Sequence, residues 1–541
     1  MIVRYQMIHK ILNTETKSVN FAAFILGVAS LISALLGLAR DLLLARQFGA
    51  GDELDVYYAA FKIPDFIALV LIMGAISAAI IPVFTQYLSR SKEEAWDFLS
   101  AFLNICLVVL IIVAASLAII APLLISLIAP GFDGEKREVA ILLTRIMFLS
   151  PIILGVSNVI SGVLQVFQRF LVTSLAPIFY NIGIILGILF LVPLMGVSGL
   201  AWGVVLGAAI HLIIQLPVFF HAGFKYKPVF NFFHQGVVKV IKLMLPRSLG
   251  LAASQINLIV ITAIASTLAA GSIAIFTLAN NIIAILIGIV AIPLTSAVFP
   301  ALSLSFFDED KTVFLKQFSL AFRHIVFLVI PLSFLFFTLK TQIISLLFES
   351  AKFGTADVQL TAACLGLFSF GIFAQGLVLL ASKTFFATHN TKTPAIISAV
   401  VVCLNIALSL FFVSILRSPN FFQENISSLF NLENSKGLEI VGLPMALSIS
   451  AIFQLFLLLL FLKKIIGSFE TKEIFNSFVK TVFASIVMAL FVRLSMVYPG
   501  FNHSNFYGLF WQTFFSVIVG LLVFVGITYF MKMTELKTLI K

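Results

Sequence analysis

Charged residues are scarce in this chain. Asp, Glu, Lys and Arg make up 11% of the 541 residues, whereas 61% of the residues are hydrophobic. Soluble globular domains carry a charged share of about 25%. The composition therefore excludes a soluble globular protein and indicates a membrane protein.

Residues that commonly carry chemistry are also few. The chain has three cysteines and seven histidines. The cysteines, Cys106, Cys364 and Cys403, lie in apolar runs without metal-ligand spacing, so we interpret them as small hydrophobic residues. The histidines are scattered, and no Walker loop, nucleophile elbow or dinucleotide fingerprint occurs. We therefore expect neither a cofactor nor a metal, and the sequence gives no support for ATP hydrolysis.

What the chain does contain is a series of long apolar runs. A membrane-spanning helix needs roughly 20 consecutive apolar residues, and such runs recur along nearly the whole sequence. We predict an all-α polytopic membrane protein with about fourteen transmembrane helices. Their approximate ranges are 20–46, 56–88, 98–128, 139–164, 171–194, 196–221, 245–268, 273–302, 315–348, 358–387, 395–416, 439–462, 474–497 and 508–531.

The net charge of +11 reflects Lys and Arg in short loops. Because these residues do not form one soluble basic face, nucleic acid is not an expected partner. Basic loops mark the cytoplasmic side of a membrane protein. The loops on the side of the N-terminus carry most of the basic residues, including a cluster at 225–242. With an even number of spans, both termini are predicted to be cytoplasmic, in the cell membrane.

Short segments recur at an offset of about 220 residues, as in an internal repeat. FGAG (48–51) matches LAAG (268–271), SAAIIPVF (77–84) matches TSAVFPAL (295–302), and LSAF (99–102) matches SLAF (319–322). We predict two pseudo-symmetric six-helix lobes around a central cavity, plus two C-terminal helices. The predicted parts are a cytoplasmic segment at 1–19, an N-lobe at 20–224, a basic connector at 225–244, a C-lobe at 245–464, and two helices with a cytoplasmic tail at 465–541.

The stretch from Gly37 to Pro64 carries charge where the rest of the chain avoids it. Arg40 and Asp41 lie near the end of a long apolar run, and Asp55 follows a Gly-rich break. Charge in a membrane span is costly and usually faces a bundle interior or an aqueous cavity. Arg40 and Asp41 either reach the headgroups or form an anion site suited to phosphate oxygens. Asp55 either is solvated or takes part in pairing and gating.

Further polar residues lie at span depth in other apolar runs. Arg145 and Arg247 are each about a turn inside a span, where they are boundary charges or cavity residues. Several amides, among them Asn281, lie in spans; most such groups hydrogen-bond between helices, and a few line cavities. Arg40, Asp41, Asp55, Arg247 and Asn281 are therefore the candidate substrate-binding residues.

These motifs resemble those of the MurJ (MviN) family of lipid II flippases, within the multidrug and oligosaccharidyl-lipid exporter superfamily. The most specific match is LGLARDLLLARQFGAGDELDVYYAAFKIP (36–64), similar to the family signature after its first helix. Supporting pieces are APGF (129–132), RF with APIFYNI (169–182), QLP (215–217), SQINLI (254–259), AKFGTAD (351–357) and KTP (392–394). The resemblance implies a central cationic cavity with alternating access, a lipid-anchored pyrophosphate sugar as substrate, and a lipid-tail groove at the last two helices.

The resemblance carries over to Arg40, Asp41 and Asp55 but fails at several other positions. Positions where the family usually places charge are uncharged here, namely Ser33, Ala34, Ala68, Leu69, Met73, Asn280 and Asn281. The chain is therefore interpreted as a divergent member of the family. Either its charge has moved, to Arg247 or Arg145 for example, or its substrate differs.

Three classes of function remain open at this point. The first is a flippase for lipid II or for another lipid-linked oligosaccharide, without bond-making catalysis. The second is a membrane-embedded polymerase or transferase acting on lipid-linked glycans. Its expected acid or His cluster is missing from the long outer loop 417–438, which has Glu424 and Glu433 but no His. The third is a scaffold for cell-wall enzymes. Expected partners are the lipid-linked pyrophosphate glycan, membrane lipids and possible cell-wall machinery, with the chain itself a monomer.

Overall fold

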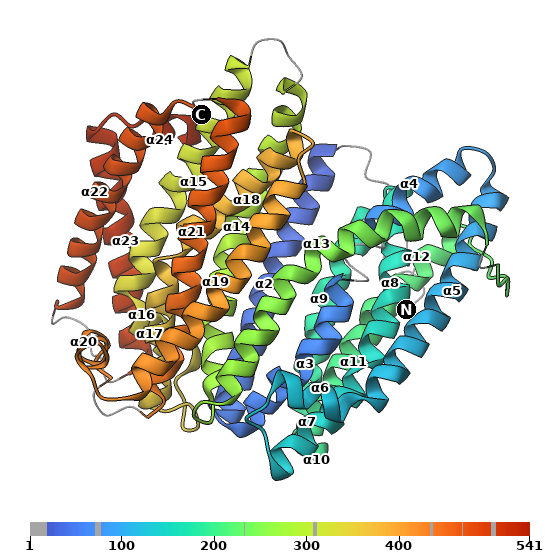
Figure 1. Cartoon of the computed structure of the whole chain (residues 1–541), viewed down its shortest axis with the longest axis horizontal. Coiled ribbons are helices and arrows are strands. Elements are labelled where there is room, and N and C mark those ends of the chain that lie inside the picture. The colour runs from blue at the N-terminus through green and yellow to red at the C-terminus, as the bar shows by residue number, and fades with distance from the viewer. Residues whose placement is uncertain are drawn as a thin grey trace. The chain divides into compact units, whose positions relative to one another are not determined.

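The computed structural model describes residues 19–70, 77–231, 233–306, 311–432, 436–467, 469–498 and 505–540. These residues form helices joined by short connections, and no strand occurs among them (Figure 1). The predicted all-α membrane fold is confirmed. Its helical character follows from the apolar composition, because a helix satisfies every backbone hydrogen bond within its own segment in lipid.

The chain divides into two compact units. Unit 1 comprises Met1–Gln47 and Gly51–Thr267, and unit 2 comprises Phe48–Ala50 and Leu268–Lys541. The long helix after the basic connector therefore groups by its contacts with unit 1, and it begins at Gln235, inside the predicted connector. The predicted lobes were defined by membrane topology, so their boundaries stay a prediction.

Unit 1 is built from helices α2 to α13. Their bounds are α2 (Val19–Phe48), α3 (Asp52–Ile67), α4 (Ser77–Leu88), α5 (Lys92–Ile119), α6 (Ala121–Ile128), α7 (Gly134–Met147), α8 (Leu149–Val166), α9 (Phe170–Leu186), α10 (Val192–Met195), α11 (Ser198–Ile213), α12 (Leu216–His221) and α13 (Gln235–Ser266). A π-helical turn at Gly187–Leu191 joins α9 to α10.

Unit 2 contains the remaining helices. Their bounds are α14 (Ser272–Ser305), α15 (Thr312–Thr338), α16 (Lys340–Phe348), α17 (Thr355–Ser369), α18 (Ile372–Ala387), α19 (Lys392–Arg417), α20 (Phe421–Phe430), α21 (Gly442–Ile466), α22 (Thr471–Met496), α23 (Phe506–Phe530) and α24 (Thr534–Ile540). A short 3₁₀ helix at Leu438–Val441 leads into α21.

Among the described residues, 11 helices are long and apolar enough to cross a membrane, or up to 12 if α17 and α18, bent by 44°, form one span. The predicted count of about fourteen is therefore not confirmed. Two predicted spans account for much of the difference. The span at 56–88 falls on α3 and α4, which are separated by the undescribed residues 71–76, and only Gln255–Ser266 of α13 qualifies, as a shorter apolar helix.

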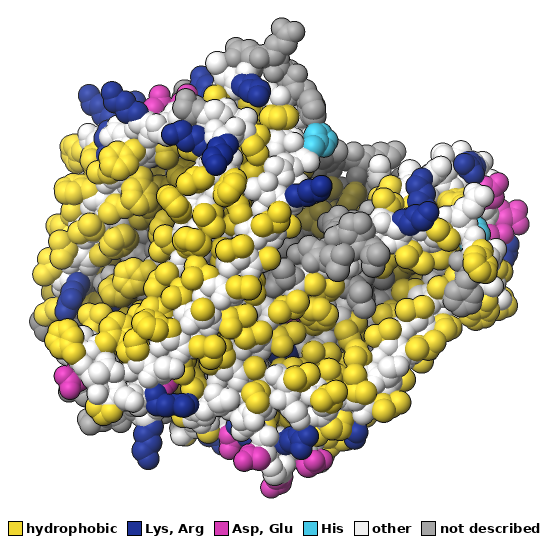
Figure 2. Space-filling model, in the orientation of Figure 1, with side chains coloured by type: hydrophobic (Ala, Val, Ile, Leu, Met, Phe, Trp, Pro, Cys, Tyr) yellow, Lys and Arg dark blue, Asp and Glu magenta, His cyan; other side chains and the backbone are white. Residues whose placement is uncertain are grey.

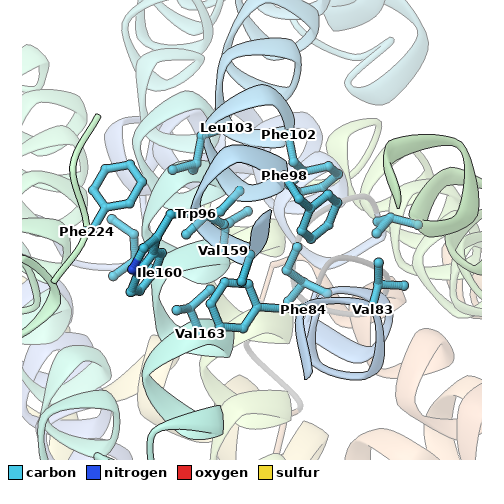
Figure 3. Close-up of a cluster of buried hydrophobic side chains, with 14 of the residues drawn as sticks. Val83, Phe84, Trp96, Phe98, Phe102, Leu103, Val159, Ile160, Val163 and Phe224 are labelled. Carbon is cyan, nitrogen blue, oxygen red and sulfur yellow. The ribbon is translucent and has the colours of Figure 1, made fainter. Parts of the chain in front are cut away.

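An aromatic core holds α4, α5 and α8 of unit 1 together (Figure 3). Trp96 of α5 packs with Phe84 of α4 at 5.4 Å between ring centroids. It also packs with Phe224, which lies in the segment after α12, at 5.6 Å. Phe98, Val159 and Val163 are fully buried beside them. Aromatic rings in such tilted and edge-on arrangements add to the packing energy of a bundle.

Glycines bring α9 and α11 into close contact. A Cβ at Gly183 would lie 2.3 Å from the Cα of Gly207, and a Cβ at Gly187 would lie 2.3 Å from the Cα of Gly203. Small residues of this kind let two membrane helices approach backbone to backbone and gain van der Waals contact, where lipid supplies no hydrophobic driving force. On α9, Asn181 contacts side chains of α2.

Candidate functional site

Arg40 and Asp41 form an ion pair within α2. The Nε and Nη2 atoms of Arg40 donate to Oδ1 of Asp41 at 3.1 and 2.9 Å. Asp41 is 2% exposed. Arg40 lies eight residues before the end of α2, about 12 Å along the helix axis. The pair is thus well inside the helix, and a buried carboxylate of this kind is expected to keep its cationic partner.

Asn181 of α9 connects this pair to another part of α2. Arg40 Nη1 donates to Oδ1 of Asn181 at 3.4 Å, while Nδ2 of Asn181 donates to the carbonyl oxygen and the hydroxyl of Ser33 at 3.3 and 3.2 Å. Ser33 is one of the positions at which charge was expected from the family resemblance. Here Ser33 accepts hydrogen bonds from the side-chain amide of Asn181 and so orients the oxygen that contacts Arg40. An uncharged residue at this position therefore helps to position Arg40.

Two tyrosines of α3 adjoin the Arg40–Asp41 pair. Tyr57 and Tyr58 are both buried, with ring centroids 5.3 Å apart, and both interact electrostatically with Arg40. Within the described part of the chain, the buried hydroxyl of Tyr58 has no hydrogen-bond partner. An unsatisfied buried hydroxyl beside a cation is costly unless a ligand or water completes it.

A second charged pair follows on α3. Lys62 and Asp65 lie one helical turn apart, both partly buried, and interact electrostatically with each other, and Asp65 also interacts with Arg40. Asp65 was not among the sequence candidates. The signal that could have found it is an i, i+3 pair of opposite charges in an otherwise apolar helix. Two cations and two carboxylates therefore converge on α2 and α3.

Asp55 belongs to a different cluster, at the first turn of α3. Its Oδ2 lies 3.6 Å from Nζ of Lys136 of α7, and the same Nζ lies 2.6 Å from Oδ1 of Asp52. Asp55 is 1% exposed, so its ion pair is mostly shielded from water. The predicted pairing of Asp55 with a basic residue is thus observed in unit 1, with Lys136 as the partner.

The two glycine turns of the predicted repeat meet in unit 2. Gly49 and Gly271 both have positive φ, at 71° and 84°. A Cβ at Gly271 would lie 2.1 Å from the carbonyl oxygen of Ala50, and one at Gly49 would lie 2.4 Å from that of Lys352. No side chain fits either position, so the contact is made by backbone alone.

Three further candidates lie on α7, α13 and α14. Arg247 lies in α13, but its side chain is outside the described residues. Asn281 is partly buried on α14 of unit 2. Arg145 donates from Nε to the carbonyl oxygen of Ala118 at 3.1 Å, near the C-terminal end of α5. The helix dipole favours a cation at this end of a helix. The charge of Arg145 therefore stabilises the C-terminal end of α5.

A statistical model of one protein family, described as "Lipid II flippase MurJ", matches residues 44–511. The chain is similar to a probable lipid II flippase MurJ of Buchnera aphidicola, 29% identical over 94% of this chain and 95% of the relative. It is also similar to a probable lipid II flippase MurJ of Thermotoga maritima, 28% identical over 96% of this chain and 98% of the relative.

Solved structures agree with these relatives. A lipid II flippase MurJ in an inward closed conformation matches with a TM-score of 0.76 and 25% identity, over 96% of this chain and all of that one. An inward-facing multidrug transporter of the MATE family shares the fold at a TM-score of 0.64, with 16% identity over 81% of this chain and 96% of that one. The chain belongs to the lipid II flippase MurJ family.

Proposed function

We propose that this chain is a flippase that moves lipid II, the lipid-linked precursor of peptidoglycan, across the cell membrane by alternating access. The family match over 44–511 supports this function. The single observation that carries the mechanism is the half-buried Arg40 within an apolar helix, held by Asp41 and Asn181. A charge kept at span depth at this cost is expected to bind a charged substrate.

In this proposal Arg40 binds the pyrophosphate of the substrate. A planar guanidinium presents paired N–H donors that match phosphate oxygens. Two of its nitrogens face Asp41, whereas within the described residues Nη1 makes a single long contact, at 3.4 Å, with Asn181. That contact can be exchanged for a stronger bond to a phosphate oxygen. Lys62 supplies a second cation on α3, and the Tyr58 hydroxyl supplies a further hydrogen-bonding group.

The acidic residues have orienting and gating roles in this proposal. Asp41 fixes the guanidinium plane, so that Arg40 meets the substrate in one geometry. Asp55, paired with Lys136 at 3.6 Å, stabilises one arrangement of the α2–α3 turn and releases it in another. Arg247 of α13 and Asn281 of α14 are proposed to contact the substrate as well.

The chain makes and breaks no covalent bond and works as a monomer with both termini in the cytoplasm, near the cell-wall synthesis machinery. A flippase for another lipid-linked oligosaccharide is the second candidate. One observation favours it: Ser33, where the family resemblance predicted charge, hydrogen-bonds to Asn181 and supplies no cation.

Complementation of a bacterium depleted of its own lipid II flippase tests the proposal. The wild-type chain is expected to restore growth and the Arg40→Ala variant to fail at equal membrane abundance. Arg46→Ala is the matched control, because Arg46 lies on the same helix with an exposed side chain. Failure of a well-expressed wild-type chain would favour the second candidate. Rescue by Arg40→Ala would contradict the role of Arg40.

A further inference from the structure

A polar pocket of about 270 Å³ lies in unit 2, and its lining residues differ from those assigned above to substrate binding. Helices α15, α22 and α24 and the turn after α23 line it. Its charged lining residues are Arg323, Glu473, Lys480, Lys532 and Glu535. The volume is close to the lower limit of about 300 Å³ for small-molecule sites, so the pocket suits a small group such as a lipid headgroup.

The two carboxylates of this pocket are both hydrogen-bonded by one arginine. Arg323 Nε donates to Oε1 of Glu535 at 2.6 Å, and Arg323 Nη1 donates to Oε2 of Glu473 at 2.9 Å. Glu535 also accepts from the Ser477 hydroxyl at 2.8 Å. Three cations therefore line the pocket against two carboxylates, and both carboxylates are already bound by Arg323.

The two lysines of the pocket have no carboxylate partner among the described residues. In the described part of the chain, neither Lys480 nor Lys532 forms an ion pair with a carboxylate. Lys480 Nζ makes one long hydrogen bond, 3.5 Å to the carbonyl oxygen of Met531. The pocket as a whole thus carries a surplus of positive charge. A surplus of this kind at the end of membrane helices attracts anions.

The backbone conformation of Lys532 also supports a binding role for its side chain. Its φ is 53°, and Met533 N donates to Thr528 O while Lys532 N donates to Tyr529 O. These two bonds form a Schellman motif, in which the left-handed residue is usually glycine. A lysine in this conformation is strained. Strain of this kind is often kept for function, here for the charge of the side chain at the rim of the pocket.

The pocket opens beside surfaces that face lipid. Phe475 and Val479 of α22 are exposed, as are Tyr529 and Phe530 at the end of α23. Figure 2 shows hydrophobic side chains over this part of unit 2 and a group of Lys and Arg side chains at its α24 end. A ligand with a phosphate and acyl chains would therefore meet cations and an apolar surface at the same point.

We propose that this pocket binds a phosphate group through Lys480 and Lys532, and that an anionic phospholipid supplies it. The headgroup phosphate lies between the two ammonium groups, and Asn476 and Thr534 offer further hydrogen bonds. The acyl chains lie along the exposed faces of α22 and α23. A free phosphate ion shares the headgroup chemistry but gains nothing from these apolar faces.

The test uses the full-length purified chain in detergent. Its thermal unfolding midpoint is followed during titration with dioleoylphosphatidylglycerol, with dioleoylphosphatidylcholine, or with inorganic phosphate. Phosphatidylglycerol is expected to raise the midpoint most. Lys480→Gln and Lys532→Gly should each weaken its apparent affinity about fivefold, as for one lost cation at a membrane surface. Lys532→Gly keeps the left-handed turn, so a failure to fold does not obscure the result.

Lys472→Gln is the matched control, because Lys472 lies exposed on α22 and does not line the pocket. It should bind phosphatidylglycerol as the wild type does. An equal loss in Lys472→Gln would overturn the proposal in favour of general surface charge. Unchanged affinity in the Lys480→Gln/Lys532→Gly double variant would overturn it as well. Equal protection by inorganic phosphate would overturn the assignment to a lipid.

Discussion

Two partly buried arginines, one in each unit, use their guanidinium groups differently. Arg323 bonds two carboxylates from two helices, Glu473 and Glu535, and also the Thr534 hydroxyl. Arg40 bonds one carboxylate, on the neighbouring residue, and makes a 3.4 Å contact with Asn181. All three nitrogens of Arg323 bond carboxylates or a hydroxyl, whereas Nη1 of Arg40 makes a long bond to a neutral amide that a ligand can replace. The comparison separates an arginine that fastens helices from one suited to bind a substrate.

The largest effect is expected from Arg323→Ala. This variant leaves Glu535, which is 4% exposed, without its cation. Breaking a buried pair by removing one partner costs about 3 kcal/mol or more. The unfolding midpoint should fall accordingly, and Arg323→Lys should recover part of the loss. An unchanged midpoint in Arg323→Ala would contradict the fastening role.

The next effect concerns transport by the Arg40 site. In Arg40→Ala/Asp41→Asn, no unpaired charge remains in the pair, so the unfolding midpoint should stay near that of the wild type. Transport of the lipid-linked precursor should fall about tenfold to a hundredfold, as expected for lost charge-assisted hydrogen bonds to phosphate. The measurement is precursor on the outer leaflet of cells depleted of their own flippase. Full transport by this stable variant would remove the contrast between the two arginines.

A third prediction follows from the pKa of Glu535. Burial opposes its ionisation, but the hydrogen bonds from Arg323 and Ser477 outweigh burial, so its pKa lies below the ordinary value of 4.5. The native state therefore binds this proton less readily than the unfolded state. The stabilisation is complete above pH 4.5 and is lost as the pH falls below that value. Unfolding midpoints measured downward from pH 6 should fall less steeply in Glu535→Gln, and parallel curves would disprove the coupling.

The smallest effect is expected from Lys532→Gly in lipid-free detergent. Glycine relieves the left-handed backbone strain at this position, which is worth about 1 kcal/mol. The unfolding midpoint should rise slightly, although a cation of the pocket is lost. A fall in the midpoint would show that the Lys532 side chain itself supports the corner beside Arg323.

Much of the fold and part of the site follow from local sequence. Apolar runs predict the helical membrane class, and the charges in 36–64 single out Arg40, Asp41 and Asp55. The Arg323 cluster was missed because its bond to Glu535 joins residues 212 positions apart, and no local pattern encodes such a contact. The span count differed for a related reason. Breaks within apolar runs, as between α17 and α18, depend on tertiary packing more than on hydropathy.

The backbone contact between the two glycine turns also has a consequence in time. Phe48–Ala50 belongs to unit 2 by its contacts, yet it is made long before Gly271 and Lys352. Ribosomes add about 5–20 residues per second, so the first turn waits on the order of 15–60 s for its partners. During that interval the first turn lacks the backbone contacts that Gly271 and Lys352 later supply. Completion of this contact is thus a late step in biogenesis, after the first helical hairpin has already entered the membrane.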